Sequence, residues 1–225
     1  MLRQAGILFV ILGICLIGWN GYGWWDQTSA VTIDKEQAQS IDEKWNDRTQ
    51  EATLLPPMEE GDDPVKPTET VEQKEVEQEE YLKTPSYEQG DEIGQLTIPK
   101  MGKIFPIHWG TDQQTLQKGV GVYDSSFTTL PNERRHTALA GHRDTVFIGL
   151  DQLAEGDRLY LEVEEKKYEY QIRDIWITDA EDRTVIVEKE KPTLTLTTCY
   201  PFDFIGSAPD RYIIQAELIK VEEVH

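Results

Sequence analysis

The chain has 225 residues, with 22 Lys and Arg against 42 Asp and Glu, so its formal net charge is −20. This excess of acid argues against a nucleic-acid-binding protein, because few cations are left to neutralise phosphates. Its hydrophobic content of 38% is low for a globular chain, so we expect part of the sequence to stay outside any core. Two cysteines are too few for a disulfide framework or a cysteine-rich metal site.

An apolar segment lies near the N-terminus. Residues 5–18 carry no charged side chain, and an aromatic cluster follows that includes Trp19 and Trp25. About 21 helical residues extend about 31 Å, which matches a hydrocarbon core, and aromatic rings favour its interface. Because Arg3 precedes the segment and acidic residues follow it, the positive-inside rule leaves the N-terminus in the cytoplasm. We therefore expect residues 1–25 to be a cytoplasmic start and single membrane anchor, with a cleaved signal peptide as the alternative.

Residues 26–87 have the composition of an acidic extracellular stalk. The stretch from Glu59 to Glu80 contains ten acidic residues and only two lysines. Prolines 56, 57, 64 and 67 would interrupt any long helix there. Such a segment buries too little apolar surface to offset its ordering entropy, so we expect a disordered tether. Residues 34–52 allow at most a short helix with a thin apolar stripe. The carboxylates show no calcium-loop spacing.

Residues 88–225 are expected to form one all-β domain with one or two short helices. Residues 111–118 predict a helix that ends at Gly119. Alternation of polar and apolar residues on both sides of 165–167 predicts a hairpin. Seven or eight strands without strand–helix alternation indicate a β-barrel or sandwich and give no sign of a parallel sheet. The expected strands are 95–99, 103–107, 120–123, 137–140, 158–164, 168–177, 194–199 and 212–221, with a further short strand at Val185–Val187.

Cys199 is the only cysteine that this topology places outside the membrane, because Cys15 lies within the apolar segment. A free thiol in an oxidising compartment needs a reason. One interpretation is a buried core thiol at the end of the alternating strand 194–199. The other is a nucleophile, because side chains at strand-to-loop junctions reach solvent.

A thiol nucleophile needs a base and a nearby cation at neutral pH. Of the four histidines, His142 has the best context, since it ends a strand beside Gly141. His108 also lies at a strand end, His136 is expected to be exposed, and His225 is terminal. Arg211 begins the strand that follows the Cys199 loop and can supply the cation, which would also stabilise an oxyanion. Its alternative role is a surface ion pair with Asp210 or Glu217.

Together these residues resemble the sortase family. The similarity lies in TLTTC at 195–199, the Arg of DRYII at 211 and the His of LAGHRDT at 142, and it covers roughly residues 93–222, most like the class D group. It implies an eight-stranded β-barrel, with Cys199 as nucleophile, His142 as general acid and base, and Arg211 as substrate and oxyanion stabiliser. It also implies that Thr197 shapes the substrate site. The long acidic stalk is not part of the family pattern.

The resemblance further implies a cysteine transpeptidase. The anchor predicted above would hold it in the membrane, and no cofactor or metal site is expected. The enzyme would cleave an LPxT-type sorting signal after Thr through a thioester, and transfer the protein to an amine of peptidoglycan or its precursor, or of a pilin. Two other functions stay open: a cysteine protease that hydrolyses the same acyl-enzyme, and a non-catalytic surface-displayed binding domain. The carboxylates of Asp174, Asp179, Glu181 and Asp182 fit no calcium loop and are expected to be solvated.

Overall fold

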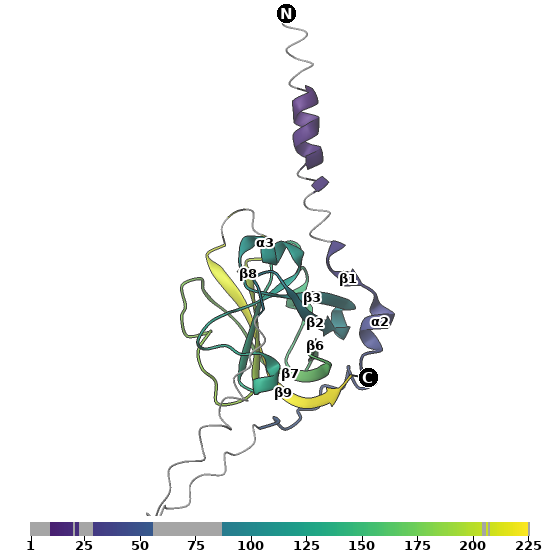
Figure 1. The fold of residues 1–225 in the computed structure, drawn as a ribbon, viewed down its shortest axis with the longest axis vertical. Helices are drawn as coiled ribbons and strands as arrows, with labels where there is room; N and C mark the ends of the chain where they lie inside the picture. Colours follow the sequence, from purple (N-terminus) through teal and green to yellow (C-terminus); the bar gives the residue numbers. More distant parts are fainter. Residues whose placement is uncertain are drawn as a thin grey trace, which may run out of the picture.

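The computed structural model describes residues 10–19, 21–22, 29–55, 87–203, 206 and 208–224. Eight strands close into a barrel, seen in Figure 1: β2 (Glu92–Ile98), β3 (Lys103–Trp109), β4 (Val120–Val122), β5 (His136–Ala140), β6 (Arg158–Val163), β7 (Lys166–Asp179), β8 (Thr193–Tyr200) and β9 (Asp210–Glu223). Their spatial order is β3-β2-β6-β7-β9-β8-β5-β4, and β4 pairs back onto β3 to close the ring. The predicted eight-stranded all-β barrel is therefore confirmed.

Short helices connect some of the strands. The predicted helix at 111–118 is α3 (Gln113–Lys118), where the Asp112 side chain accepts hydrogen bonds from two main-chain N–H groups of the first turn. Those bonds satisfy donors that have no partner within a helix. Three single 3₁₀ turns complete the set: η1 (Pro99–Met101), η2 (Pro131–Glu133) and η3 (Leu150–Gln152).

Two strand pairs are parallel, β3 with β4 and β5 with β8. The expectation of no parallel pairing is therefore wrong. For β3 and β4 the sequence carried a sign of it, because the predicted helix 111–118 lies between their two strands, whereas two intervening strands separate β5 from β8. The strand expected at Val185–Val187 is wrong, since these residues lie in bends of the segment between β7 and β8. Val185 is buried there without joining the ladder.

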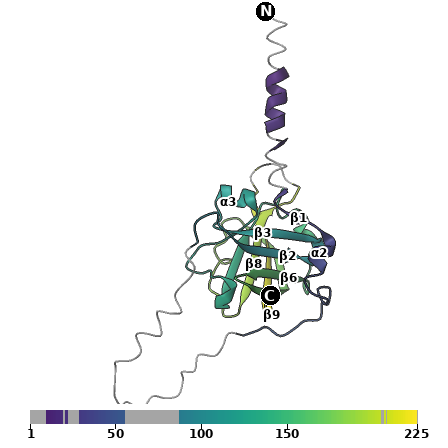
Figure 2. The ribbon, with the colours of Figure 1, turned by 45° about the vertical axis from the view of Figure 1, so that its right-hand side comes forward.

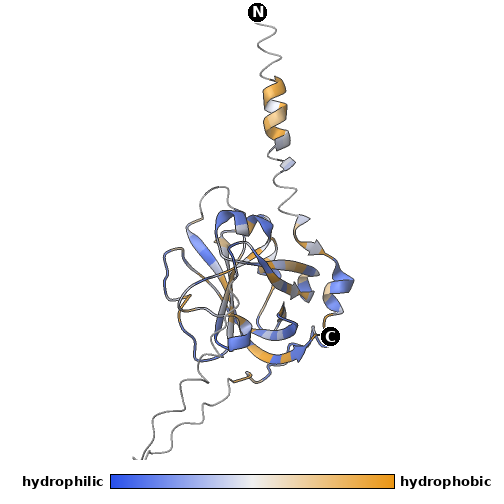
Figure 3. Ribbon diagram, in the orientation of Figure 1, coloured by the Kyte–Doolittle hydropathy of each residue, from blue (hydrophilic) through white to orange (hydrophobic). Residues whose placement is uncertain are grey.

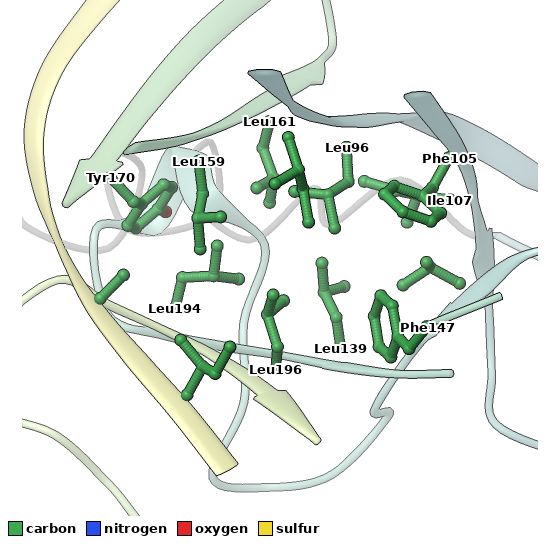
Figure 4. Packing of buried hydrophobic residues seen from close by; sticks show 14 of the residues in the cluster. Leu96, Phe105, Ile107, Leu139, Phe147, Leu159, Leu161, Tyr170, Leu194 and Leu196 are labelled. Carbon is green, nitrogen blue, oxygen red and sulfur yellow. The ribbon is translucent and has the colours of Figure 1, made fainter. Parts of the chain in front are cut away.

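The barrel interior is filled by side chains from alternate positions of the strands (Figure 4). Leu194 and Leu196 of β8 face inward with Leu139 of β5, and Leu159 and Leu161 of β6 lie across from them. All five are essentially inaccessible to solvent, and burying such a side chain contributes about 1.5–3 kcal/mol each. This alternation leaves the opposite face of β5 and β8 available for other side chains.

Residues 29–55, which we call the N-terminal strap, lie against the barrel. Strand β1 (Thr32–Ile33) pairs with the start of β3, and α2 (Lys35–Gln39) follows it with Ala38 fully buried. Figures 1 and 2 both show this part of the strap beside β2 and β3. The predicted stalk is therefore wrong for these residues, and the remaining part, residues 56–86, lies outside the described residues.

The second half of the strap is held by side chains of the barrel. Arg158 donates to the Asp47 carbonyl oxygen at 2.9 Å and forms an ion pair with Glu51 at 2.6 Å. The Leu54 N–H donates to the Leu218 carbonyl oxygen at 2.7 Å. Composition could not predict this packing, because most of these bonds join strap main-chain groups to barrel residues and need little apolar surface from the strap.

Residues 10–19 and 21–22 are helical, and Figure 3 shows the first of these stretches as hydrophobic. Within the described residues, no helix reaches the length and apolarity needed to cross a bilayer. Residues 1–9, 20 and 23–28, which complete the predicted anchor, lie outside that part of the chain. The anchor thus stays a prediction.

Candidate functional site

Cys199 and Arg211 lie side by side on neighbouring strands. Strands β8 and β9 are antiparallel, and their register places Cys199 directly opposite Arg211. Side chains of directly opposed residues share one face of the sheet, with Cβ atoms about 4.5–5.5 Å apart. Cys199 is a free, half-buried thiol. The register thus brings a thiol and a guanidinium group together from positions twelve residues apart in the sequence.

His142 follows the end of β5, which pairs with β8 on the side away from β9. In the parallel pair of β5 and β8, Ala140 is level with Thr197. The pairing continues past the end of β5, because the Gly141 N–H donates to the Thr197 carbonyl oxygen at 3.2 Å and the Thr198 hydroxyl donates to the Gly141 carbonyl oxygen at 2.7 Å. His142 directly follows Gly141, so the chain carries it toward the end of β8 where Cys199 lies.

Arg211 is oriented by main-chain groups. Its Nη1 donates to the carbonyl oxygens of Asp210 at 2.9 Å and Ala208 at 3.4 Å. The alternative of an ion pair with Glu217 does not hold, because that carboxylate pairs with Arg173 and Lys191. Contact with Asp210 is through its main-chain carbonyl group rather than its carboxylate. The guanidinium group of Arg211 therefore keeps its charge uncompensated by either of these two carboxylates.

Thr197 lies on the same face of β8 as Cys199 and is 5% exposed. On this face Ala140 of β5 is level with Thr197, Thr195 precedes it on β8, and Ile213 of β9 lies opposite it. Leu194 and Leu196, by contrast, point into the core. The row that leads to Cys199 thus offers hydroxyl and methyl groups and no bulky side chain on β8.

Tyr123 is part of the site and carried no signal in the sequence. It follows β4, and its N–H donates to the Ala138 carbonyl oxygen at 2.9 Å. Burial raises the pKa of Tyr123, while the charge of Arg211 lowers it and that of Cys199 raises it, so the phenol lies within electrostatic range of both groups. The pairing of β4 with β5 brings Tyr123 close to Cys199 and Arg211. The local sequence pattern does not show which strands pair, so it could not predict this position.

His108 and His136, the other histidines that the structure describes, do not join the site. His136, expected to be exposed, is completely buried because β5 lies in the middle of the sheet with both faces covered. His108 is also buried, on β3, and His225 lies outside the described residues. Within the described ranges, no group of three or more His, Cys, Asp and Glu side chains is arranged to hold a metal ion.

Comparison with known proteins points to one family. The model of the sortase domain matches residues 96–219. Sortase D of Bacillus subtilis is 43% identical over 133 residues, which cover 59% of this chain and 66% of that protein. The catalytic domain of B. anthracis SrtD is 55% identical, with a TM-score of 0.55, over 62% of this chain and 95% of that domain. A Clostridium perfringens sortase C structure with the C-terminal cell wall sorting motif is 29% identical, with a TM-score of 0.55, over 60% of this chain and 74% of that one.

Proposed function

The chain belongs to the sortase family, whose members are cysteine transpeptidases, and we propose that it cleaves an LPxT-type sorting signal and joins the cleaved protein to an amine. The match to sortase D spans just under two thirds of that protein, so its full activity is part of this proposal. The observation that carries the proposal is the register that sets Cys199 opposite Arg211, and the pairing of β5 with β8 that ends just before His142 supports it.

In the proposed reaction, the Cys199 thiolate attacks the carbonyl carbon of the Thr–X bond. A Sγ–C bond forms, and Arg211 stabilises the negative charge that develops on the oxygen. His142 protonates the leaving amine as the C–N bond breaks, which leaves a thioester. An amine of peptidoglycan, of its precursor or of a pilin then attacks the thioester, His142 accepts its proton, and the thiolate departs.

Substrate contacts are assigned by position. Thr197 lies two residues before Cys199 on the same face of β8. We therefore propose that it contacts the residues of the sorting signal that precede the scissile bond. The structure of the related sortase C with a cell wall sorting motif supports this substrate class. We also propose that residues 1–25 anchor the chain in the cell membrane and that the barrel lies outside the cell, because a wall amine is accessible only there.

The first test uses the full chain in detergent micelles, mixed with LPxT-type pentapeptides and an excess of a primary amine. We expect mass spectrometry to find a thioester on Cys199 and an amide product. Cys199→Ala should lower turnover by roughly 10⁴-fold, because the nucleophile is lost. Cys15→Ala, which removes the other cysteine, is the matched control and should keep full activity.

Two outcomes would favour the other functions. Peptide hydrolysis with no amide product, even at high amine concentration, would indicate a cysteine protease. Absence of both adduct and cleavage for every peptide, with a folded barrel, would indicate a binding domain. Turnover by Cys199→Ala at a rate close to that of wild type would refute the assignment of the nucleophile.

A further inference from the structure

The segment between Cys199 and Arg211 is held by the residue next to His142. Residues 201–209 connect β8 to β9. Arg143 donates from Nη1 to the Pro201 carbonyl oxygen at 2.9 Å and from Nη2 to the Gly206 carbonyl oxygen at 2.8 Å. One guanidinium group therefore forms hydrogen bonds to two carbonyl groups of this connection that lie five residues apart.

The same connection is held near its other end. Arg211 donates to the carbonyl oxygens of Ala208 and of Asp210, the first residue of β9, so two guanidinium groups together bind three carbonyl oxygens of the connection. The base of Arg143 is itself fixed, because the Phe147 N–H donates to the His142 carbonyl oxygen at 2.8 Å and closes the turn that carries both residues. Movement of the connection would thus disturb the hydrogen bonds of Arg143, the neighbour of His142, and those of Arg211 together.

We propose that Arg143 is a positioning residue, which keeps Cys199, His142 and Arg211 in one arrangement by tying the connection after Cys199 to the turn after His142. This inference rests on the roles proposed above for those three residues. The planar guanidinium group presents donors in a fixed fork and can hold both carbonyl groups at once. A lysine ammonium at the end of a flexible stem lacks this geometry.

The test compares Arg143→Gln and Arg143→Lys with Arg135→Gln in the full chain, all in a Cys15→Ala background. Arg135 is a matched control, because its side chain is 54% exposed and pairs with Glu188 away from the 201–209 connection. Amide hydrogen exchange of peptides from residues 200–210 measures how well ordered the connection is. Steady-state kinetics with an LPxT-type peptide give kcat and KM. The pH profile of Cys199 alkylation by iodoacetamide reports the ionisation of the thiol.

For Arg143→Gln we expect exchange in 200–210 to be about tenfold faster, with exchange in β2, β6 and β7 unchanged. We expect kcat to fall by about ten- to a hundredfold while KM changes less than threefold, because bound substrate meets a misplaced Arg211. Arg143→Lys should lie between wild type and Arg143→Gln. Arg135→Gln should match wild type, and the pH profile of alkylation should be the same in all four proteins.

Several results would overturn the proposal. Unchanged exchange in 200–210 for both Arg143 variants would show that the contacts do not order the connection. Faster exchange with unchanged kcat would show that its order does not matter for catalysis, and a shifted alkylation profile would indicate an electrostatic role instead. If Arg143→Gln does not fold, Arg143→Lys decides. If wild type cleaves no peptide, the proposed function fails, and the exchange data still decide whether Arg143 orders the connection.

Discussion

His136 links two parts of the molecule through a buried imidazole ring. Its Nδ1 lies 2.6 Å from the Val187 carbonyl oxygen and its Nε2 lies 2.8 Å from the Thr195 hydroxyl oxygen. Thr195 is on the face of β8 that leads to Cys199, and Val187 belongs to the segment between β7 and β8. Burial lowers the pKa of His136, and the positive charge of Lys189 acts in the same direction. The ring is therefore neutral in the folded protein at neutral pH.

This lowered pKa predicts a pH dependence of stability. Unfolded His136 binds a proton below about pH 6.5, whereas the folded protein resists it, so folding is penalised as the pH falls through that value toward the folded pKa. Between pH 7.5 and 5.5 we expect wild type to lose about 1 kcal/mol more unfolding free energy than His136→Gln. Urea unfolding at both pH values measures this. An equal loss in the two proteins would show that His136 does not contribute.

At the scale of elements, the N-terminal strap is joined to the barrel around a buried ion pair. Arg158 and Glu169 are each 3% exposed in their side chains, and Glu51 of the strap completes the group from outside. Burial alone would lower the pKa of Arg158, but hydrogen bonds to Glu169 and Glu51 outweigh it and raise the pKa. A second cation–carboxylate contact, Arg48 with Asp157, lies nearby at 3.3 Å. The strap thus supplies ion-pair partners for two charged side chains of the barrel, Arg158 and Asp157.

Helix α2 offers a direct test of this packing. Ala38 is fully buried and Gln37, its neighbour, is exposed. We expect Ala38→Glu to lower the free energy of unfolding by about 2–4 kcal/mol, because a carboxylate must enter an apolar contact or the strap must leave the barrel. Gln37→Glu adds the same charge to the same helix and should change it by less than about 0.5 kcal/mol.

Urea unfolding of both α2 variants, followed by circular dichroism, gives the comparison. Equal stabilities would mean that α2 does not pack on the barrel in solution.

At the scale of the whole molecule, chain order and spatial order differ. Parallel pairing of β5 with β8, and of β4 with β3, closes the ring and collects the candidate site at one end of β5, β8 and β9. The strap pairs with β3 and makes further hydrogen bonds to residues of β6, β7 and β9. Site and strap therefore occupy different regions of the barrel.

This separation predicts how a shortened chain behaves. A chain that begins at residue 87 keeps every barrel strand but loses the strap, so we expect it to melt several degrees lower than one that begins at residue 29. It leaves Arg158 without Glu51 and exposes the barrel surface that covers Ala38. Thermal unfolding measures the difference, and a peptide of residues 29–55 in excess should restore part of it by mass action.

Equal melting temperatures of the two chains, or no effect of the peptide, would show that the strap adds nothing to stability. Adduct formation on Cys199 by the shorter chain, tested with the same pentapeptides, would show that the site forms without the strap.

The strand alternation and the helix after residue 110 were predictable, because each depends on residues close together in the sequence. The assignment of Cys199, His142 and Arg211 depends on a recognisable motif and stays a prediction, although the register of β8 and β9 brings two of these residues together. The strap was not predictable, because its average composition is that of a tether while single groups such as Ala38 find partners on distant strands. The burial of His136 and the contacts of Tyr123 and Arg143 were likewise decided by tertiary structure. They depend on which strands pair and in what register, and pairing between distant segments leaves no local pattern in the sequence.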